Sequence, residues 1–247
     1  MAANPKKLRV VSARFAGPMT RVLDVECVEG GAFDVVGGKY VIVHTGITVD
    51  EKAIKRAYSL MPAFGAKGRA RIAVKRLSGP GSNALHEVPV GAVLGFSGPW
   101  GKLLPEGGLG ERTLLVATDT GITSALGIVE EHALAGREAR PLEVLWLRAS
   151  DDWFFDVGDV RARVERAGVA FTTAEIPAVF GAGREEGAFR FALARARELE
   201  ATHVIATGDG AIVHPLVDRL PSRAPSVKDV RIECFFRNPA KKSDSIA

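Results

Sequence analysis

Residues 56–59 read Arg-Ala-Tyr-Ser and residues 79–82 read Gly-Pro-Gly-Ser, inside a stretch rich in strand-forming residues. The tyrosine offers an aromatic face, and the arginine offers a permanently charged fork of hydrogen-bond donors. The serine at 59 can bond the polar edge of a ring, and the glycine-rich segment lets main-chain N–H groups approach an anion. Together these residues suit a dinucleotide with a flat ring system and a pyrophosphate. Taken alone, a tyrosine on a strand is more often a packing residue.

Two further segments follow in order: residues 98–101 read Gly-Pro-Trp-Gly, and residues 120–123 read Thr-Gly-Ile-Thr. With the first two, they resemble the motifs of the ferredoxin–NADP reductase superfamily, which occur in the same order. The resemblance implies an N-terminal antiparallel β-barrel that binds FAD, followed by a Rossmann-like parallel α/β domain that binds NADP or NAD. It also implies a flavin-dependent oxidoreductase.

The resemblance assigns roles within the FAD site. It implies that Arg56 binds the pyrophosphate, that Tyr58 packs on the isoalloxazine ring, and that Ser59 lies near the reactive nitrogen of that ring. The phosphates would be capped by the glycine-rich segment, through Gly79, Gly81 and Ser82.

The final strand completes this expectation. Its sequence Glu-Cys-Phe-Phe, residues 233–236, resembles the Glu-x-aromatic ending of the family. By that resemblance Glu233 joins Ser59 as a catalytic candidate for proton transfer, and Phe236 covers the flavin. Phe235 is an equal candidate for the cover, and core packing is an alternative for both rings.

A second set of residues forms the implied NAD(P) site, at the ends of three predicted strands: Thr118, Thr120, Gly121, Thr123, Arg148, Gly208 and Asp209. A strand meeting a helix there would place helix N-terminal amides against a phosphate. The alternative is an ordinary strand-to-helix turn in which a threonine caps the helix. For Arg148 the alternative is a solvent-facing side chain beside two aspartates at 151 and 152.

The chain departs from the family pattern at two positions in this set. Where the family has Gly-Gly before Thr-Gly, this chain has Thr118 and Asp119. Where the family commonly has Cys-Gly-Pro, it has Thr207 (or Ala206) in the approximate place of the thiol, and Asp209 follows. Each acid adds a negative charge close to an expected anion, so a degenerate nicotinamide site is an alternative.

Composition limits the classes of protein. The chain has 247 residues, 47% hydrophobic and 25% charged, which suits one large domain or two small ones. No run of eighteen apolar residues predicts a membrane span, and no apolar leader is seen. The two cysteines, Cys27 and Cys234, lack metal-ligand spacing, so we expect no metal site and a cytoplasmic protein.

Charge is unevenly distributed. Residues 1–104 hold 15 Lys/Arg against 7 Asp/Glu, and residues 105–247 hold 18 against 22, so the first part is basic. A basic surface favours an acidic partner, and the resemblance suggests ferredoxin, flavodoxin or a larger redox assembly. The densest basic segment, residues 67–76, is more simply explained as a solvated strand face. Nucleic-acid binding is disfavoured because aromatic residues are not interleaved with these charges.

Hydrophobic patterns predict the two domains, 1–104 and 111–247, with a Gly- and Pro-rich linker at 103–110. About six short strands with turn signals favour a closed barrel in the first, with a helical turn at 50–55. Alternating strands and helices favour a parallel sheet in the second, whose strands we expect at 114–117, 142–147, 169–172, 203–207 and 229–236.

We therefore expect an FAD-dependent oxidoreductase that passes electrons between NAD(P)H, FAD and a protein or small-molecule acceptor. The first alternative is an FAD-binding electron-transfer or regulatory subunit with a degenerate nicotinamide site. A flavin-free scaffold is a weaker alternative, against which the Arg-x-Tyr-Ser motif argues.

Overall fold

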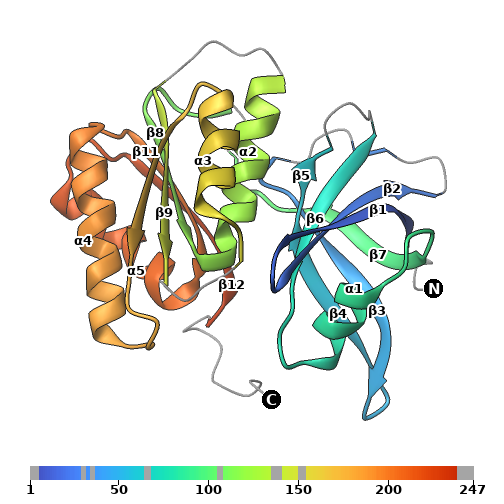
Figure 1. The fold of residues 1–247 in the computed structure, drawn as a ribbon. Coiled ribbons are helices and arrows are strands. Elements are labelled where there is room, and N and C mark those ends of the chain that lie inside the picture. The colour runs from blue at the N-terminus through green and yellow to red at the C-terminus, as the bar shows by residue number, and fades with distance from the viewer. Residues whose placement is uncertain are drawn as a thin grey trace.

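The computed structural model describes residues 6–28, 32–33, 37–63, 68–104, 108–134, 141–149 and 154–237. These residues form two sheets that lie side by side, one from each half of the chain (Figure 1). The first sheet ends with residue 100 and the second begins with residue 113. This division is compatible with the predicted domains 1–104 and 111–247, whose boundaries stay a prediction.

The first sheet is antiparallel and has seven strands in the order β4-β3-β7-β1-β2-β6-β5. They are β1 (Lys6–Gly17), β2 (Thr20–Cys27), β3 (Tyr40–Val49), β4 (Lys52–Ser59), β5 (Met61–Pro62), β6 (Arg69–Lys75) and β7 (Val93–Trp100). Alternate residues point inward, as Leu8 and Val10 of β1 do, and build a buried core. The predicted antiparallel barrel is confirmed except for its closure: among the described residues, β4 and β5 remain edge strands, because β5 is only two residues long.

Two local predictions need correction. The expected helical turn at 50–55 is instead the hairpin between β3 and β4, where Asp50 and Glu51 have φ values of 47° and 62°. Consecutive left-handed residues are typical of tight hairpins. The predicted turn at 79–82 is instead the start of helix α1 (Pro80–Glu87), with proline in the first turn, where its missing N–H is not needed.

The second sheet is parallel, as predicted, and its strand order is β10-β9-β8-β11-β12. Its strands are β8 (Thr113–Thr118), β9 (Leu142–Arg148), β10 (Ala170–Glu175), β11 (His203–Asp209) and β12 (Asp229–Phe236). Every residue of β8 is buried, which explains its unbroken apolar sequence, because helices cover both faces.

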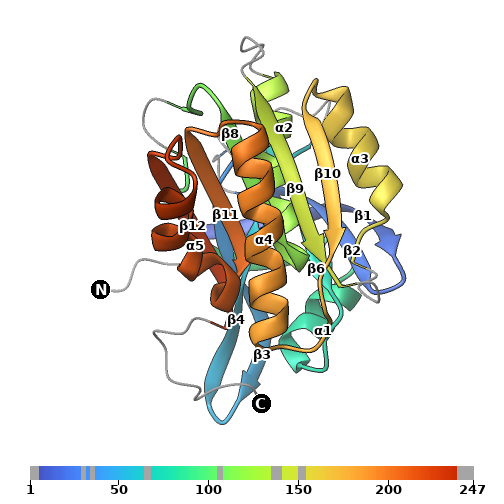
Figure 2. The same cartoon turned by 90° about the vertical axis from the view of Figure 1, so that its left-hand side faces the viewer.

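The helices lie in two layers. Helices α2 (Ile122–Leu134) and α3 (Val157–Arg166) pack on one face of the sheet, and α4 (Ala182–Glu198) and α5 (Gly210–Arg223) pack on the other (Figure 2). A short 3-10 turn, η1 (Asp119–Gly121), joins β8 to α2. The strand order reverses between β8 and β11, and ligands of open parallel sheets bind outside the strand ends at such a point.

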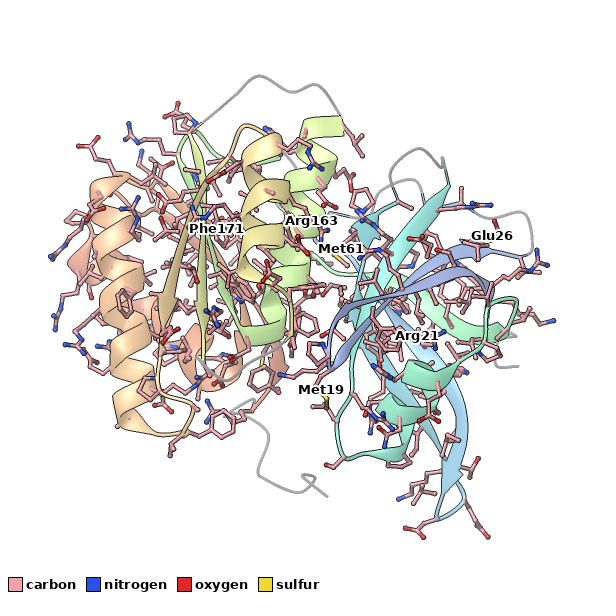
Figure 3. The ribbon with its side chains drawn as sticks, in the orientation of Figure 1. Met19, Arg21, Glu26, Met61, Arg163 and Phe171 are labelled. Atoms are coloured by element: carbon pink, nitrogen blue, oxygen red, sulfur yellow. The ribbon has the colours of Figure 1, made fainter. Side chains whose placement is uncertain are left out.

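The two sheets share one interface, centred on α2. Met61 of β5 belongs to the same buried apolar cluster as Ile122 and Leu126 of α2 (Met61 is labelled in Figure 3). A Cβ atom at Gly127 would overlap the carbonyl oxygen of Leu60. Only glycine therefore lets this helix approach the backbone between β4 and β5 so closely.

A buried ion triad closes the same interface. Glu130 of α2, which is 1% exposed, lies 2.8 Å from Arg71 of β6 and 2.7 Å from Arg163 of α3. Burial lowers the pKa of the Arg71 guanidinium, and Glu130 opposes that shift. One arginine from each half of the chain thus contacts the same buried carboxylate (Arg163 is labelled in Figure 3).

We predict that Gly127→Ala destabilises the protein by about 1–3 kcal/mol, because the new methyl group must displace main chain rather than a side chain. Gly187→Ala is the matched control: this glycine lies inside α4 and has no atom within 4 Å of the added Cβ. The control should gain up to about 1 kcal/mol from helix propensity. Urea unfolding measures both, and equal stability of the two variants would contradict the close contact.

Candidate functional site

A cavity of about 840 Å³ lies between the two sheets. The first sheet contributes β4 and neighbouring strands, and the second contributes strand ends and the loop before α4. The predicted site residues among its lining are Arg56, Tyr58, Ser59, Ser82, Thr120, Thr123, Glu233 and Phe236. Residues far apart in the chain thus meet in one place, and the functional roles assigned to them stay predictions.

Arg56 and the glycine-rich segment meet at one end of this cavity. A Cβ at Gly81 would lie 3.6 Å from the Arg56 Cζ atom, and a Cβ at Gly79 would lie 3.8 Å from its Nη2 atom. The guanidinium therefore lies against the N-terminus of α1, which has no side-chain cap and no acidic residue in its first turn. Both groups attract anions, and within the described part of the chain no carboxylate forms an ion pair with Arg56.

Ser82 is buried in the first turn of α1, where its hydroxyl lies 3.0 Å from the carbonyl oxygen of Gly79 and donates to it. That bond holds the glycine-rich segment in its turn. Ser82 lines the cavity, yet its single proton is already used by the main chain.

Aromatic rings provide the flat surfaces. Tyr58 projects into the cavity wall from β4, and burial raises the pKa of its phenol while nearby Arg56 lowers it, so the phenol is neutral. Both Phe235 and Phe236 line the cavity from β12. The sequence did not decide which of the two rings covers the flavin. Their positions do not decide it either, because both rings line the cavity.

A chain of polar groups runs behind this wall. Ser124 Oγ on α2 lies 3.1 Å from Ser59 Oγ on β4 and 3.3 Å from Glu233 Oε2 on β12. The pKa of Glu233 is raised to about 7, because burial raises it by more than the hydrogen bond from Ser124 lowers it. Sequence reasoning singled out Ser59 and Glu233 but missed Ser124. Nothing in the sequence distinguishes Ser124 from any other serine on a helix.

The two strand-to-helix turns of the second sheet pack on each other. A Cβ at Gly121 would overlap the Thr207 carbonyl, and a Cβ at Gly208, where φ is 121°, would overlap Thr118. Thr207 Oγ1 donates to the Gly121 carbonyl oxygen at 2.9 Å, and Thr118 Oγ1 accepts from the Asp209 N–H at 2.6 Å. Both glycines thus allow close packing between the turns. The hydroxyl groups of Thr118 and Thr207 are used in hydrogen bonds between the same turns.

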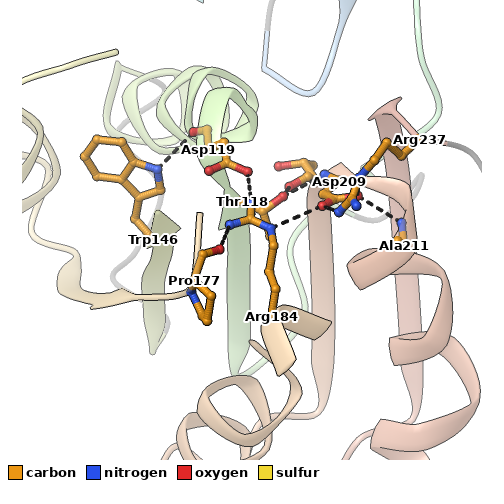
Figure 4. A network of polar contacts seen from close by, with 9 residues as sticks. Thr118, Asp119, Trp146, Pro177, Arg184, Asp209, Ala211 and Arg237 are labelled. Carbon is orange, nitrogen blue, oxygen red and sulfur yellow. Dashed lines mark hydrogen bonds and ion pairs between the residues drawn. The ribbon is translucent and has the colours of Figure 1, made fainter. Parts of the chain in front are cut away.

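The two unexpected acids are joined by a buried arginine (Figure 4). Arg184, only 2% exposed, forms an ion pair with Asp119 and lies 3.5 Å from Asp209 Oδ2. Arg237, just after β12, adds a bidentate pair with Asp209, whose Oδ1 also accepts the Ala211 N–H at the start of α5. Two positive and two negative side chains therefore form one set, which removes the excess negative charge that the sequence alone suggested.

Neither arginine was recognisable from the sequence. Arg184 lies 65 residues from Asp119, and Arg237 lies 28 residues from Asp209. Phe180, which lines the cavity, has its ring 3.7 Å from the Arg237 Cζ atom and 5.5 Å from that of Arg184.

The other residues predicted to bind the nucleotide are only partly at the cavity. Thr120 and Thr123 line the cavity, and Thr123 Oγ1 donates to the Thr120 carbonyl oxygen at 2.9 Å. Arg148 lies 3.5 Å from Glu175 at the edge strand and is not among the cavity residues. The aspartates expected beside it, at 151 and 152, lie outside the described residues.

Among the residues that the structure describes, no group of three or more His, Cys, Asp or Glu side chains is placed to hold a metal ion. Among the same residues, no helix combines the length and the apolar character needed to cross a membrane.

Comparison with known proteins agrees with this geometry. Residues 8–104 match the oxidoreductase FAD-binding domain family. A curated relative, ferredoxin–NADP reductase B of Sorangium cellulosum, is 34% identical over 146 residues, which are 59% of this chain and 57% of the relative. The matched part thus spans little more than half of that relative.

Solved structures show the same fold over nearly the whole chain. The FAD/NAD-binding domain of nitric oxide dioxygenase from Vibrio cholerae has a TM-score of 0.68 at 16% identity, covering 94% of this chain and 99% of that one. Phthalate dioxygenase reductase has a TM-score of 0.66 at 20% identity, covering 92% and 67%.

The two sheets with a cavity between them form the fold of the solved structures that match this chain. The chain is similar to ferredoxin–NADP reductase, and its residues 8–104 match the oxidoreductase FAD-binding domain family.

We predict that Glu233→Gln changes the pH dependence of stability. Because the folded pKa of about 7 exceeds the ordinary 4.5, the wild type loses stability relative to the variant as pH rises from about 4.5 through about 7. The free energy of unfolding of the variant should therefore increase relative to that of the wild type between about pH 5 and pH 8. Urea unfolding at each pH measures this difference. A constant difference between the two proteins would contradict a buried, protonated carboxyl group.

We predict that Arg184→Met destabilises the protein by about 3–5 kcal/mol, because Asp119 loses its buried partner. Arg190→Met, an exposed position on the same helix, is the control and should change stability by less than about 0.5 kcal/mol. A variant at 184 that unfolds at the wild-type urea concentration would show that the ion set contributes nothing.

Proposed function

We propose that the protein is an FAD-dependent NAD(P)H oxidoreductase that passes electrons to a protein or small-molecule acceptor. The single observation that supports this most is the position of Arg56, whose guanidinium lies against the uncapped N-terminus of α1 at the cavity that Tyr58 and Ser59 line. A cation, free helix amides, an aromatic face and a hydroxyl are what a flavin dinucleotide requires.

The residues fit FAD. Arg56 and the main chain at Gly79 and Gly81 would hold the pyrophosphate. The Arg56 guanidinium donates to the Lys55 carbonyl oxygen but has no carboxylate partner among the described residues, and it lies beside a helix N-terminus without a side-chain cap. Tyr58 and one of the two phenylalanines would enclose the ring system. When bound, FAD supplies the redox chemistry by accepting hydride and releasing single electrons, and the protein supplies orientation and electrostatics.

The chain's own groups would hold and move protons at the same place. Ser59 lies on the cavity wall, and Glu233, with its pKa raised by burial to about 7, can be either protonated or ionised near neutral pH. The two are the catalytic candidates of this proposal.

NADP or NAD is the proposed electron donor. Its nicotinamide end would enter the cavity beside Thr120 and Thr123, which line it from the second sheet, with Phe180 at the same wall. Gly121 and Gly208 would keep the two turns packed beneath it, and Arg148 would serve the far, adenosine end.

The proposed acceptor is an acidic electron carrier such as ferredoxin or flavodoxin, alone or within a larger redox assembly. Support comes from the basic balance of residues 1–104, which carry 15 Lys/Arg against 7 Asp/Glu. In the densest basic segment, Arg69, Arg71 and Arg76 are each paired with a glutamate, so this segment presents less net positive charge than its sequence suggests.

A second candidate function is an FAD-binding electron-transfer or regulatory subunit that does not use nicotinamide. The ion set favours it, because Asp119 and Asp209 place the chain's own carboxylates at the starts of α2 and α5. A pyrophosphate placed at either helix would meet a carboxylate that is already held.

The experiment is to purify the protein, add FAD if needed, and titrate it with NADH or NADPH in the absence of oxygen. We expect a yellow protein whose absorbance bleaches within seconds. Colour without bleaching by either nucleotide would support the second candidate, and failure to hold FAD at all would reject both.

Arg56→Met sharpens the test. It should weaken FAD binding about tenfold or more, because a charged donor to the pyrophosphate is lost. Lys55→Met is the matched control, since strand alternation places that exposed neighbour on the opposite face of β4. Equal FAD affinity of the two variants would contradict the assigned pyrophosphate site.

A further inference from the structure

We propose that Ser124 is a positioning residue that joins Ser59 to Glu233 in one proton path, running from the cavity wall through the start of α2 to the C-terminal strand. The inference deepens the proposed function and rests on it, since the path would serve the flavin site.

The path crosses both sheets. Ser59 ends β4 of the first sheet, Ser124 lies in the first turn of α2, and Glu233 lies in β12. Ser124 Oγ is 3.1 Å from Ser59 Oγ and 3.3 Å from Glu233 Oε2, so both contacts are within hydrogen-bond distance.

Exposure distinguishes the middle residue from the two ends. Ser59 and Glu233 both line the cavity, whereas Ser124 does not, and it is 0% exposed. A ligand in the cavity can therefore contact either end, while the connection between them is kept from water by the protein. A buried connection of this kind lets protons pass without opening the cavity.

A hydroxyl group has one proton, which fixes the two arrangements that the path can take. When Glu233 is ionised, Ser124 donates to the carboxylate and accepts from Ser59. When Glu233 is protonated, the carboxyl donates to Ser124, and Ser124 donates to Ser59. The protonation state of Glu233 thus decides whether Ser59 donates a hydrogen bond to Ser124 or accepts one from it.

Transfer along the path is balanced. The carboxyl O–H bond of Glu233 breaks as a new O–H bond forms at Ser124, whose original proton moves to Ser59. The original proton of Ser59 would pass to a proton acceptor bound in the cavity. One proton leaves Glu233, both serines end neutral, and no electron moves along the path.

The surroundings of Glu233 suit this switching. Burial raises its pKa to about 7 and the hydrogen bond from Ser124 lowers it, so both protonation states are accessible near neutral pH. The neighbouring group in register on β11 is the uncharged Thr207. The other titratable groups that line the cavity are Tyr40, Arg56, Tyr58, Lys75, Asp119, Arg184 and Cys234.

The test is a double-mutant cycle on the pKa of Glu233, in the full chain and without any nucleotide donor. The variants are Ser59→Ala, Ser124→Ala and both together. The Glu233 signal is followed by NMR of carbon-labelled glutamate across the pH range, and it is assigned by its loss in Glu233→Gln.

We expect Ser124→Ala to raise the pKa of Glu233 by about half a unit, because the carboxylate loses a donor. Ser59→Ala should raise it by less in the otherwise unchanged protein, since Ser59 acts on the carboxylate only through Ser124. In the Ser124→Ala background, Ser59→Ala should leave the pKa unchanged. A structural role for Ser124 in packing alone would produce no such dependence.

The proposal is overturned if Ser59→Ala shifts the pKa of Glu233 equally in both backgrounds, or in neither. If Ser124→Ala does not fold, Ser59→Ala alone decides, because an unchanged pKa for Glu233 in that variant rejects the connection. These measurements do not involve NAD(P)H. The proton path and the proposed use of NAD(P)H can therefore be confirmed or rejected separately.

Discussion

The contact between Gly127 and the Leu60 carbonyl is the constraint on which the site depends. Leu60 directly follows Ser59, and Gly127 lies three residues after Ser124, about one helical turn along the same helix. The close approach of α2 to this piece of backbone therefore also brings the two serine hydroxyls together. The apolar cluster around Met61 and the triad at Glu130 hold the same interface from either side. The geometry of the cavity is thus set by packing between the sheets, and not by the cavity residues themselves.

Buried charges elsewhere in the molecule are matched by opposite charges. Glu130 has two arginines, and Asp119 and Asp209 share Arg184 and Arg237, as expected where desolvation makes an unpaired charge costly. Arg56 is exposed, not buried, and it lies at the cavity against a helix N-terminus that no acid caps. Two sources of positive potential left together indicate a place for an anionic ligand, and a pyrophosphate has the charge and size that the position suits.

The sequence predicted what depends on local pattern. The final strand was placed at 229–236, where β12 lies, because its flanking turns and β-branched residues are local signals. The hairpin at Asp50 and Glu51 was missed because neither residue is the glycine or asparagine that announces left-handed backbone. Ser124, Arg184 and Arg237 were missed for another reason. Their partners lie 28–109 residues away, and no pattern in one chain reports such a pairing.

Asp119 shows how the chain keeps the backbone of a glycine loop while changing its chemistry. It occupies a position where the related motif has glycine, and it retains a left-handed φ of 49°, a conformation that costs an aspartate of the order of 1 kcal/mol. Two contacts maintain it: the Trp146 indole donates to its carbonyl oxygen at 2.9 Å, and Arg184 pairs with its carboxylate. The carboxylate of Asp119 is therefore directed to an internal cation. A nucleotide at this edge would meet a loop of familiar shape whose charge is already neutralised, so its binding must depend on contacts other than the loop's own electrostatics.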